Sequence, residues 1–412
     1  MKKSLFANER KIPMTFGYEP SELTQRDELL YACQELTPIL QAANDTVEKE
    51  RHLSNELAER LAQAGLYRMF VPRALGGLEA DVHTFVAVVE KLAQANAAAA
   101  WCTFISNTST IIGGYLPNPE AKLLFENPNI KMAGVFAPRG TAVRTVVDGV
   151  SGFLVNGSWM WGSASYNADF ITGGCVILGE DGKPEKLTDG TLENRSMVFR
   201  AEQVSIADTW HTLGLRGTGS NEYSVKNAFV PAGLSASILT DVPIPGALFK
   251  FPVFCILGVG IAAVALGIAR LAIDSLIELA TKKTPQGSAR LLAERASTQQ
   301  HVARAEAQLR SARAFLIDAV DRAWSASTDA GEISVALRRD LRLATTHASE
   351  EAVKVVTRVY SCAGGSAIFD DSPLQRCLRD VLTASQHMMV SESTYELTGR
   401  LYLGLPTNSA ML

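Results

Sequence analysis

The apolar residues of the chain recur with a helical period in its first and last thirds and with a strand period between them. In the first third, apolar residues at three- and four-residue steps would share one face of a helix. This pattern covers 22–65, 81–94 and the alanine-rich run 96–112. Residues 1–20 follow no period and are expected to form a loose or docking arm. The first third is therefore predicted to be mostly helical.

Between residues 130 and 242, short runs rich in β-branched residues are separated by glycine, aspartate and proline. Alternating apolar and polar positions bounded by such residues predict an antiparallel sheet or a small barrel. The pairs Asp148-Gly149 and Asn156-Gly157 are candidates for tight hairpin turns, because these residue types accept a positive φ.

The helical period returns at Phe249 and covers the rest of the chain. Three long segments, 252–282, 291–328 and 332–363, are followed by a helix expected to begin at Ser372-Pro373. Four long helices in succession favour an up-and-down bundle. The predicted fold class is α+β, with an N-terminal helical domain over 1–129, a central β domain over 130–245 and a C-terminal helical bundle over 246–412.

The first of these bundle helices includes an uncharged stretch, 251–269, that comes close to the length of a membrane span. It contains Pro252, and its pattern continues into Arg270 and Asp274, so a buried helix is expected and no membrane partner. The segment 258–263, GVGIAA, imitates a dinucleotide-binding glycine motif. Because it lies inside one continuous helical pattern, we interpret it as a site of close helix packing.

Composition narrows the function classes. A chain of 412 residues with 47% hydrophobic residues can bury substantial cores, and a net charge of −4 with scattered basic residues argues against a nucleic-acid partner. The six cysteines lie mostly in apolar runs without a Cys-x-x-Cys pair, which suits reduced thiols in a cytoplasmic protein. The N-terminal residues contain no sustained apolar segment, so a secretory signal is not expected.

The histidines are interpreted one by one. His387 would share a helical face with Arg376 and Asp380, held on a rigid helix, where an imidazole of near-neutral pKa can donate a hydrogen bond or take a proton. His211 is expected at a surface or strand end, with a place at the border of the substrate entrance as the alternative. The remaining histidines are expected to be structural and without convergent partners: His52, His83, His301 and His347. None has metal-ligand spacing with cysteines or carboxylates, so no metal site is predicted.

A glycine pair, Gly364-Gly365, precedes the last expected helix. Without a Cβ, such a pair lets backbone N–H groups approach a phosphate, as a nucleotide pyrophosphate would require. The alternative is that the pair merely ends the helix before it. On this stretch alone, the helix-ending interpretation is the favoured one.

The order of helices, sheet and bundle, together with four motifs, resembles the acyl-CoA dehydrogenase superfamily over nearly the whole chain. The motifs are LYRMFVPRALGGLEAD, VNGSWMWGSASYNADF, GLRGTGSNEYSVKNAFVP, and CAGGSA followed by PLQRCLRD. The resemblance implies a flavin cofactor, FAD in preference to FMN, and a homotetramer in which Gly364 and Gly365 help hold a neighbour's dinucleotide. It also places Arg290 and Gln299 near the cofactor pyrophosphate, while Ser361 stands where many members have glutamine.

The general base of the family's dehydrogenases is missing from both of its usual places. After Arg379-Asp380 no acid occurs before Glu392, and the FCILGVG segment has neither an acid nor an arginine. His387 stands near the first place instead, which is similar to the two-component flavin-dependent monooxygenases of this superfamily. The resemblance implies reduced flavin supplied by a separate NAD(P)H flavin reductase, and O2 that adds to it as a C4a-hydroperoxide.

The resemblance also implies roles for individual residues. His387 is expected to be catalytic, Ser163 to lie beside flavin N5, and Trp161 and Phe136 to contact the cofactor. Asn107 and Asn167 stand where several relatives carry histidines. The candidate substrate-binding residues are Asn107, Phe254, Leu257 and Met388.

These observations predict a flavin-dependent monooxygenase that acts on a small aromatic or heteroaromatic substrate, such as an indole or phenol derivative. Two alternatives stay open. One is an acyl-CoA dehydrogenase-type flavoprotein that oxidises an acyl thioester with an unrecognised base. The other is a non-catalytic family member that serves as an assembly partner.

Overall fold

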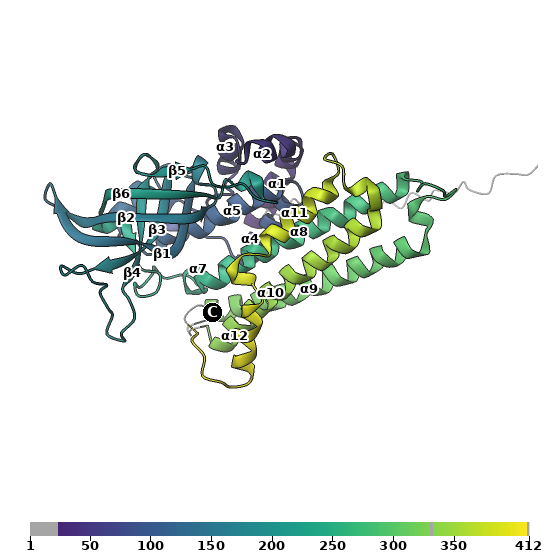
Figure 1. Ribbon diagram of the computed structural model, residues 1–412. Coiled ribbons are helices and arrows are strands. Elements are labelled where there is room, and N and C mark those ends of the chain that lie inside the picture. The colour runs from purple at the N-terminus through teal and green to yellow at the C-terminus, as the bar shows by residue number, and fades with distance from the viewer. Residues whose placement is uncertain (1–23, 330–332, 410–411) are drawn as a thin grey trace, which may run out of the picture.

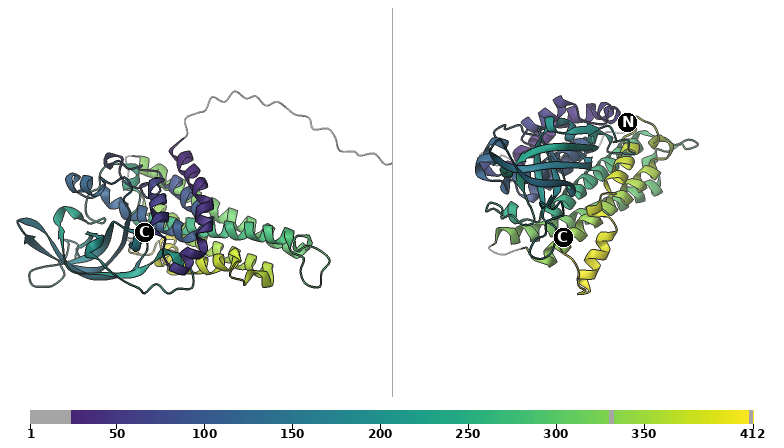
Figure 2. Two further views of the ribbon diagram at one scale, coloured as in Figure 1. Left: turned by 90° about the horizontal axis from the view of Figure 1, so that it is seen from above. Right: turned by 60° about the vertical axis from the view of Figure 1, so that its left-hand side comes forward.

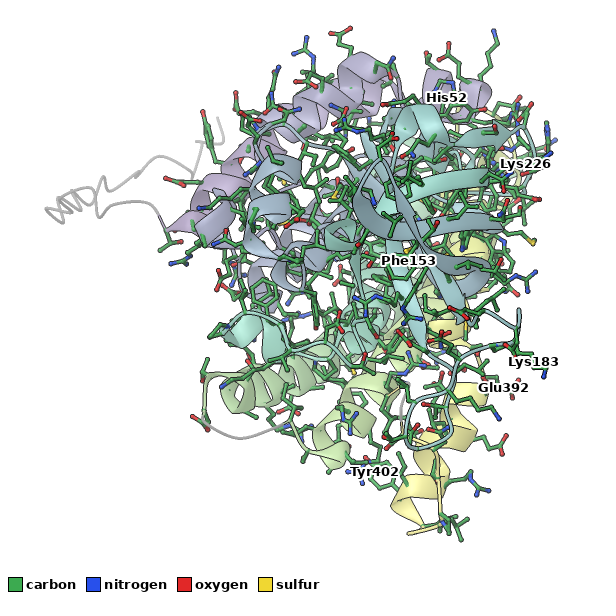
Figure 3. All side chains as sticks on the ribbon, turned by 90° about the vertical axis from the view of Figure 1, so that its left-hand side faces the viewer. His52, Phe153, Lys183, Lys226, Glu392 and Tyr402 are labelled. Carbon is green, nitrogen blue, oxygen red and sulfur yellow. The ribbon has the colours of Figure 1, made fainter. Side chains whose placement is uncertain are left out.

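The computed structural model describes residues 24–329, 333–409 and 412, and the expected N-terminal arm lies outside these ranges. N-terminal helices, a central sheet and a C-terminal group of long helices follow one another along the chain (Figure 1). The helices α8, α9 and α10 extend away from the sheet, as the view from above also shows (Figure 2). In Figure 3, His52 beside the N-terminal helices and Tyr402 on α12 lie near opposite edges of the view.

The N-terminal helices start where the sequence provides capping side chains. Thr24, Ser54, Asp81 and Asn96 each accept a hydrogen bond from a first-turn N–H group. The six helices are α1 (Gln25–Ala42), α2 (Asn44–Glu50), α3 (Asn55–Gln63), α4 (Val82–Ala93), α5 (Ala97–Thr110) and α6 (Asn118–Leu124). Every residue of α5 is buried, so this helix can carry side chains into the interior.

The central sheet has seven strands in the order β5-β6-β2-β1-β3-β4-β7. Neighbouring strands of this sheet are antiparallel except β1 and β3, which run parallel. The strands are β1 (Met132–Val147), β2 (Val150–Gly162), β3 (Phe170–Leu178), β4 (Asn194–Arg200), β5 (Ser205–Ala207), β6 (Asn221–Pro231) and β7 (Ser235–Ala236). The expectation of an antiparallel sheet holds apart from that one pair.

One of the two predicted turns is confirmed. Asp148 and Gly149 connect β1 to β2 with φ values of 51° and 80°. Asn156-Gly157 is instead inside β2, where the register with β6 shifts, and that prediction is wrong. Asn156 Oδ1 accepts a hydrogen bond from Asn227 N across this bulge at 2.8 Å. A Cβ at Gly157 would lie 2.6 Å from the Trp159 ring, so glycine serves close packing there and no turn.

The C-terminal part is built around the apolar helix α8. Its helices are α7 (Ala247–Lys250), α8 (Val253–Lys282), α9 (Ala296–Thr328), α10 (Val335–Ala363), α11 (Pro373–Ala384) and α12 (Ser393–Tyr402). By length and composition α8 is the one helix of the described residues that could cross a membrane, yet most of its apolar window is buried inside the protein. It contacts helices of both helical regions, namely α4, α5, α9, α10 and α11.

The predicted long helix carrying His387 is interrupted, and this expectation is wrong. Helix α11 ends at Ala384, and His387 is the N-cap of a separate 3₁₀ turn, η9 (Met388–Val390), before α12 begins. The His387 side chain caps that turn by accepting a hydrogen bond from Met389 N. Arg376 and Asp380 therefore share a helix with each other but not with His387. Serine hydroxyls bond locally to main-chain carbonyls here, which competes with a continuous helix.

Small residues allow α8 to pack closely, as expected for 258–263. A Cβ on Gly260 would lie 2.6 Å from the Phe104 ring of α5. A Cβ on Gly267 would lie 2.4 Å from the Glu90 carbonyl oxygen and 2.5 Å from Ala93 Cβ, both on α4. The backbones of α4 and α8 are thus too close for any larger residue at 267.

We therefore expect Gly267→Ala to destabilise the protein by about 1–3 kcal/mol, because the added methyl group forces the two helices apart. Gly399→Ala in α12 is the matched control, since a Cβ there meets nothing within 4 Å. That change should be neutral or stabilising, as alanine favours helix. Chemical denaturation followed by circular dichroism compares the two, and equal midpoints would contradict the packing.

Candidate active site

A chain of buried hydroxyl groups joins α5 to the loop between β5 and β6. Trp101 Nε1 donates to Ser163 Oγ at 3.0 Å, and Ser163 Oγ lies 2.6 Å from Ser220 Oγ. Ser220 Oγ lies 2.6 Å from Thr218 Oγ1, which donates to the Leu215 carbonyl at 2.8 Å. Ser163, the predicted cofactor contact, is therefore part of a connected polar network in an apolar interior.

The direction of the protons along this chain follows from counting donors. Each hydroxyl group has one proton, and that of Thr218 is committed to the Leu215 carbonyl. Ser220 must then donate to Thr218, and Ser163 must donate to Ser220. Ser163 also receives the Trp101 N–H, so one lone pair remains on its oxygen. Ser163 thus presents an acceptor to any group bound beside it.

Trp161 projects outward from the end of β2. Its side chain is 65% exposed and its φ is 65°, a conformation that bulky residues rarely adopt. Ala164 also has a positive φ, of 63°. These two left-handed residues turn the chain so that the indole of Trp161 faces outward while the Ser163 hydroxyl faces inward. The exposed indole of Trp161 suits the face of a planar cofactor, and the buried oxygen of Ser163 suits a donor at its edge.

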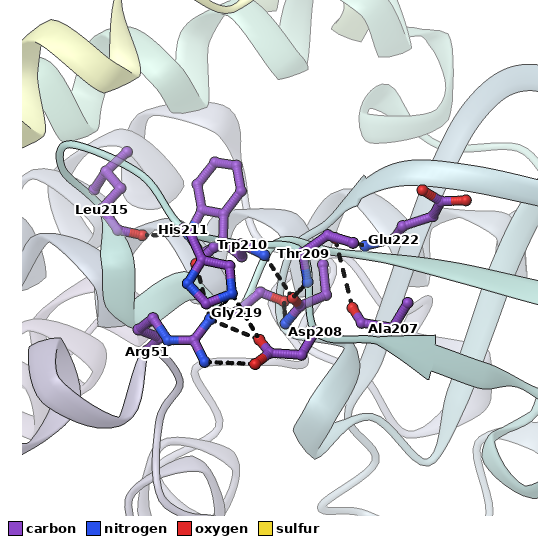
Figure 4. Close-up of polar contacts among 10 residues, drawn as sticks. Arg51, Ala207, Asp208, Thr209, Trp210, His211, Leu215, Gly219 and Glu222 are labelled. Atoms are coloured by element: carbon purple, nitrogen blue, oxygen red, sulfur yellow. Dashed lines mark hydrogen bonds and ion pairs between the residues drawn. The ribbon is translucent and has the colours of Figure 1, made fainter.

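The loop that carries Thr218 and Ser220 is held by an ion pair from the N-terminal helices (Figure 4). Arg51 binds Asp208 through two contacts of 2.6 and 2.8 Å and donates to the Trp210 carbonyl at 3.2 Å. Asn221 Oδ1 accepts from the main-chain N–H groups of Thr209 and Trp210. His211 lies next to Arg51 and is largely exposed, in agreement with its expected surface position.

Asp380 connects α11 to the same loop. Its Oδ1 accepts a hydrogen bond of 2.6 Å from the main-chain N–H of Leu215, a non-glycine residue with φ of 47°. Burial raises the pKa of the Asp380 carboxyl to about 6, although the Leu215 N–H opposes this. The neighbouring Arg379 pairs with Glu48 and donates to the Leu213 carbonyl at 2.9 Å. The Arg-Asp pair of the motif therefore has a positioning role here.

His387 lies on the other side of Trp101, with ring centroids 6.2 Å apart. Its Nδ1 accepts from Met389 N at 3.2 Å, so the proton of the neutral ring is on Nε2. Burial, together with the positive charge of Arg342, lowers the pKa of His387 to about 4. The expectation of a near-neutral pKa is wrong, because the imidazole is buried and adjacent to a cation. At pH 7 the ring is neutral and presents an N–H donor.

The remaining substrate and cofactor candidates differ in their surroundings. Asn107 is fully buried, and its amide bonds the main chain at Leu66, Phe70 and Thr103, which ties α5 to the segment before it. Asn167 likewise donates to the Leu53 carbonyl and to Asn55. Both amides are therefore used in structural contacts.

The apolar candidates come from β1, from the first turns of α8 and from the turn η9. Phe136 on β1 and Phe254 on α8 are half-buried, and Leu257 is buried one turn further along α8. Met388, directly after His387, is exposed. The structure brings His387, Trp101 and Ser163 together through direct ring and hydrogen-bond contacts.

A second group of predicted residues lies at the far end of the bundle. Arg290 belongs to the connection from α8 to α9, Gln299 lies in the first turn of α9, and Gly364 and Gly365 follow α10. Figures 1 and 2 show that this end of the bundle points away from the sheet. Lys283 Nζ joins the two connections by donating to the Ala363 carbonyl at 2.8 Å. From Gly260, beside Phe104, to the end of α8 the helix spans roughly 33 Å. These residues and Ser163 of one chain therefore lie far apart.

The residues that sequence reasoning missed are Trp101, Thr218, Ser220 and Arg342. Trp101 is a single tryptophan in an alanine-rich helix, and that contrast in size was the one available signal. Arg342 lies in a run of basic residues that is typical of a solvated helix face, yet it is buried. His83 also differs from expectation, because it contacts both Asp81 and Asp321, and the Asp81 hydrogen bond raises its pKa. No group of three or more potential metal ligands occurs in the described ranges.

The chain is similar to known flavoproteins. The family models match over 29–116, "Acyl-CoA dehydrogenase, N-terminal domain", and over 259–392, "Acyl-CoA dehydrogenase, C-terminal domain". Indole-3-acetate monooxygenase of Pseudomonas putida is 30% identical over 358 residues, which covers 87% of this chain and 89% of that protein. The oxygenase subunit HsaA, a flavin-dependent monooxygenase of Mycobacterium tuberculosis, is 27% identical and covers 95% of this chain and 100% of its own length.

Among solved structures, XiaF from Streptomyces sp., in complex with FADH2 and glycerol, has a TM-score of 0.84 at 26% identity. The match covers 92% of this chain and 96% of XiaF. Helical, sheet and helical regions in this order, with a hydroxyl network where the sheet meets α5, define a protein of the acyl-CoA dehydrogenase fold. The chain belongs to the acyl-CoA dehydrogenase superfamily, in its branch of two-component flavin-dependent monooxygenases. It is accordingly a flavin-dependent oxidoreductase.

The raised pKa of Asp380 predicts a specific pH dependence of stability. The folded-state pKa of about 6 exceeds the usual value of 3.8. The protonated carboxyl therefore adds to the free energy of unfolding below pH 4, and this stabilisation is lost as the pH rises through 6. We expect Asp380→Asn to remove this loss. Relative to the variant, the wild type should lose on the order of 2–3 kcal/mol of unfolding free energy between pH 4 and pH 7.

Denaturant titrations of both proteins across this range measure the difference. Asp370→Asn, at an exposed position shortly before α11, is the control and should change the unfolding free energy by less than about 0.5 kcal/mol. A difference between wild type and Asp380→Asn that stays constant with pH would show that Asp380 is ionised over the whole range.

Proposed function

We propose that this enzyme uses reduced flavin and O2 to oxygenate a small aromatic or heteroaromatic substrate, such as an indole or phenol derivative. The observation that carries the proposal is the neutral, buried His387, which presents an N–H donor next to Trp101. The named activity of the Pseudomonas putida relative, on indole-3-acetate, supports an aromatic substrate.

The predicted cofactor-binding residues suit a flavin ring. Trp161 and Phe136 would contact its faces, and the free lone pair of Ser163 would accept a hydrogen bond from the N5–H that reduced flavin carries. When bound, reduced flavin supplies the two electrons that activate O2, so that one oxygen atom reaches the substrate and the other leaves as water.

The protein's own contribution is to orient the reactants and exclude water. Phe104 packs against Trp101, the ring neighbour of His387, and Phe254 and Leu257 lie on α8, which contacts η9. Such an apolar surface would protect a reactive oxygen donor from side reactions. His387 Nε2–H would donate a hydrogen bond to the oxygen being transferred. With a pKa of about 4 the ring is a poor base at pH 7, so we assign it the role of donor.

Acyl thioester oxidation is disfavoured by the same site. That reaction requires a carboxylate base. Asp380 is held by Leu215 N, and Glu48 is paired with Arg379. Neither carboxylate is available to abstract a proton from a substrate.

We further propose the cofactor, assembly and location. FAD is preferred to FMN, because Gly364 and Gly365 leave open space for a dinucleotide, as nothing lies within 4 Å of a Cβ built at either position. Since these glycines lie far from Ser163 in one chain, a neighbouring subunit of a homotetramer would supply them. The reduced flavin would come from a separate NAD(P)H flavin reductase, in keeping with a relative named an oxygenase subunit, and the enzyme would be cytoplasmic.

We expect His387→Ala to bind reduced flavin within about three-fold of wild type yet to release hydrogen peroxide in place of oxygenated product. The hydrogen bond from Nε2 is lost, and one bond between neutral groups contributes about 1 kcal/mol, which is roughly five-fold. The assay combines a flavin reductase, NADH, air and an indole or phenol panel. Product is measured by mass spectrometry, and peroxide by a coupled peroxidase.

His387→Asn distinguishes a donor from a base. Asparagine keeps an N–H donor but cannot accept a proton as a base, so it should recover part of the product yield if His387 donates. Unchanged product yield in His387→Ala would remove this residue from the mechanism. Equal losses in both variants would favour proton abstraction.

A further inference from the structure

The buried face of α10 contains a cation without a counter-ion. Arg342 is 5% exposed, and its Nε and Nη1 atoms have no hydrogen-bond partner. Among the described residues it forms no ion pair, whereas Arg339 of the same helix pairs with Asp340. Burying a charged guanidinium without a partner is strongly unfavourable. An arrangement of this kind is expected where a ligand supplies the missing negative charge.

The neighbours of Arg342 do not provide that charge. Its field acts on His387 of η9 and on Cys255 of α8, so these side chains lie close to it. His387 is neutral at pH 7, and burial raises the pKa of the Cys255 thiol to about 12, so the thiol is neutral too. Arg338, one helical turn earlier, adds a second guanidinium whose Nε lacks a partner. The environment is therefore positive and lacks an internal anion.

A polar group on the same helix face completes the site. Thr346 is one turn after Arg342 and so faces the same side of α10. Its hydroxyl is buried and has no hydrogen-bond partner. A buried guanidinium with unpartnered donors and a buried hydroxyl group suit a carboxylate, because arginine binds carboxylates through charge-assisted hydrogen bonds.

We propose that Arg342 binds a carboxylate group of the substrate, so that the enzyme takes aromatic carboxylic acids. The inference rests on the proposed function, because His387 and Trp101 then mark the ring end of the site. The acid end lies at Arg342, on the neighbouring helix α10. The charge thus fixes which end of the substrate faces the oxygen donor.

The test compares indole-3-acetate with indole-3-acetamide, which share the ring and differ in charge. Each is titrated by calorimetry into the flavin-free full-length chain at pH 7. The wild type should bind the acid at least about ten-fold more tightly than the amide, because charge-assisted hydrogen bonds exceed neutral ones. Arg342→Gln should weaken binding of the acid about 10- to 100-fold and leave that of the amide nearly unchanged.

Two controls separate recognition from folding. Arg358→Gln removes another α10 arginine whose Nε has no partner but which lines an outer groove with His301, and it should keep the preference for the acid. In the absence of ligand, Arg342→Gln should melt at or above the wild-type temperature, since it removes an unpaired buried charge. Indole-3-acetate should raise the melting temperature of the wild type but not of Arg342→Gln. Arg342→Lys, which keeps the charge without the fork, serves if the glutamine variant does not fold, and should bind the acid with intermediate affinity.

The outcomes separate this inference from the proposed function. Equal affinity of the wild type for acid and amide, an unchanged acid preference in Arg342→Gln, or no binding of either compound would overturn the inference. If binding of the acid depends on Arg342 but no aromatic compound yields an oxygenated product, the inference is supported and the proposed function is overturned. If acidic and neutral indoles are oxygenated equally, and Arg342→Gln leaves both rates unaffected, the proposed function is supported and the inference is overturned.

Discussion

The hydrogen bond between Asp380 and the main chain of Leu215 fixes the geometry on which the site depends. It holds a non-glycine residue at φ of 47°, and this residue begins the segment that contains Thr218 and Ser220. The Leu215 carbonyl accepts the Thr218 hydroxyl, so the same residue ends the hydroxyl chain from Trp101. A single buried carboxylate thereby positions side chains from the bundle, the sheet loop and α5. Its raised pKa reflects the cost of that placement.

The electrostatics of the site favour a neutral imidazole. A histidine is usually invoked because it titrates near pH 7, but His387 is buried beside a guanidinium, and both effects disfavour its charged form. The superfamily's dehydrogenases depend on a carboxylate that removes a proton. Here the carboxylate of the shared Arg-Asp motif supports the loop, and the imidazole offers a hydrogen bond. The change in chemistry therefore comes from the surroundings of each group as well as from its identity.

Much of the architecture was predictable because it depends on local patterns. The helical periods located α8, α9 and α10 to within a few residues, and Asp148-Gly149 formed the expected turn because both residues accept positive φ. Asn156-Gly157 has the same local chemistry but pairs across a bulge with Asn227, a contact distant in sequence. The end of α11 was missed because His387 caps a new turn. The burial of Arg342 depends on three elements meeting, which periodicity does not encode.

The hydroxyl chain of Ser163, Ser220 and Thr218 ends on a peptide carbonyl, which has no proton to pass on and cannot keep one it receives. The chain therefore orients these hydroxyl groups but does not conduct protons. Ser163 can hold its orientation through many turnovers without exchanging protons with bulk water by this path. Protons that the reaction takes up or releases must therefore reach solvent by a path other than this chain.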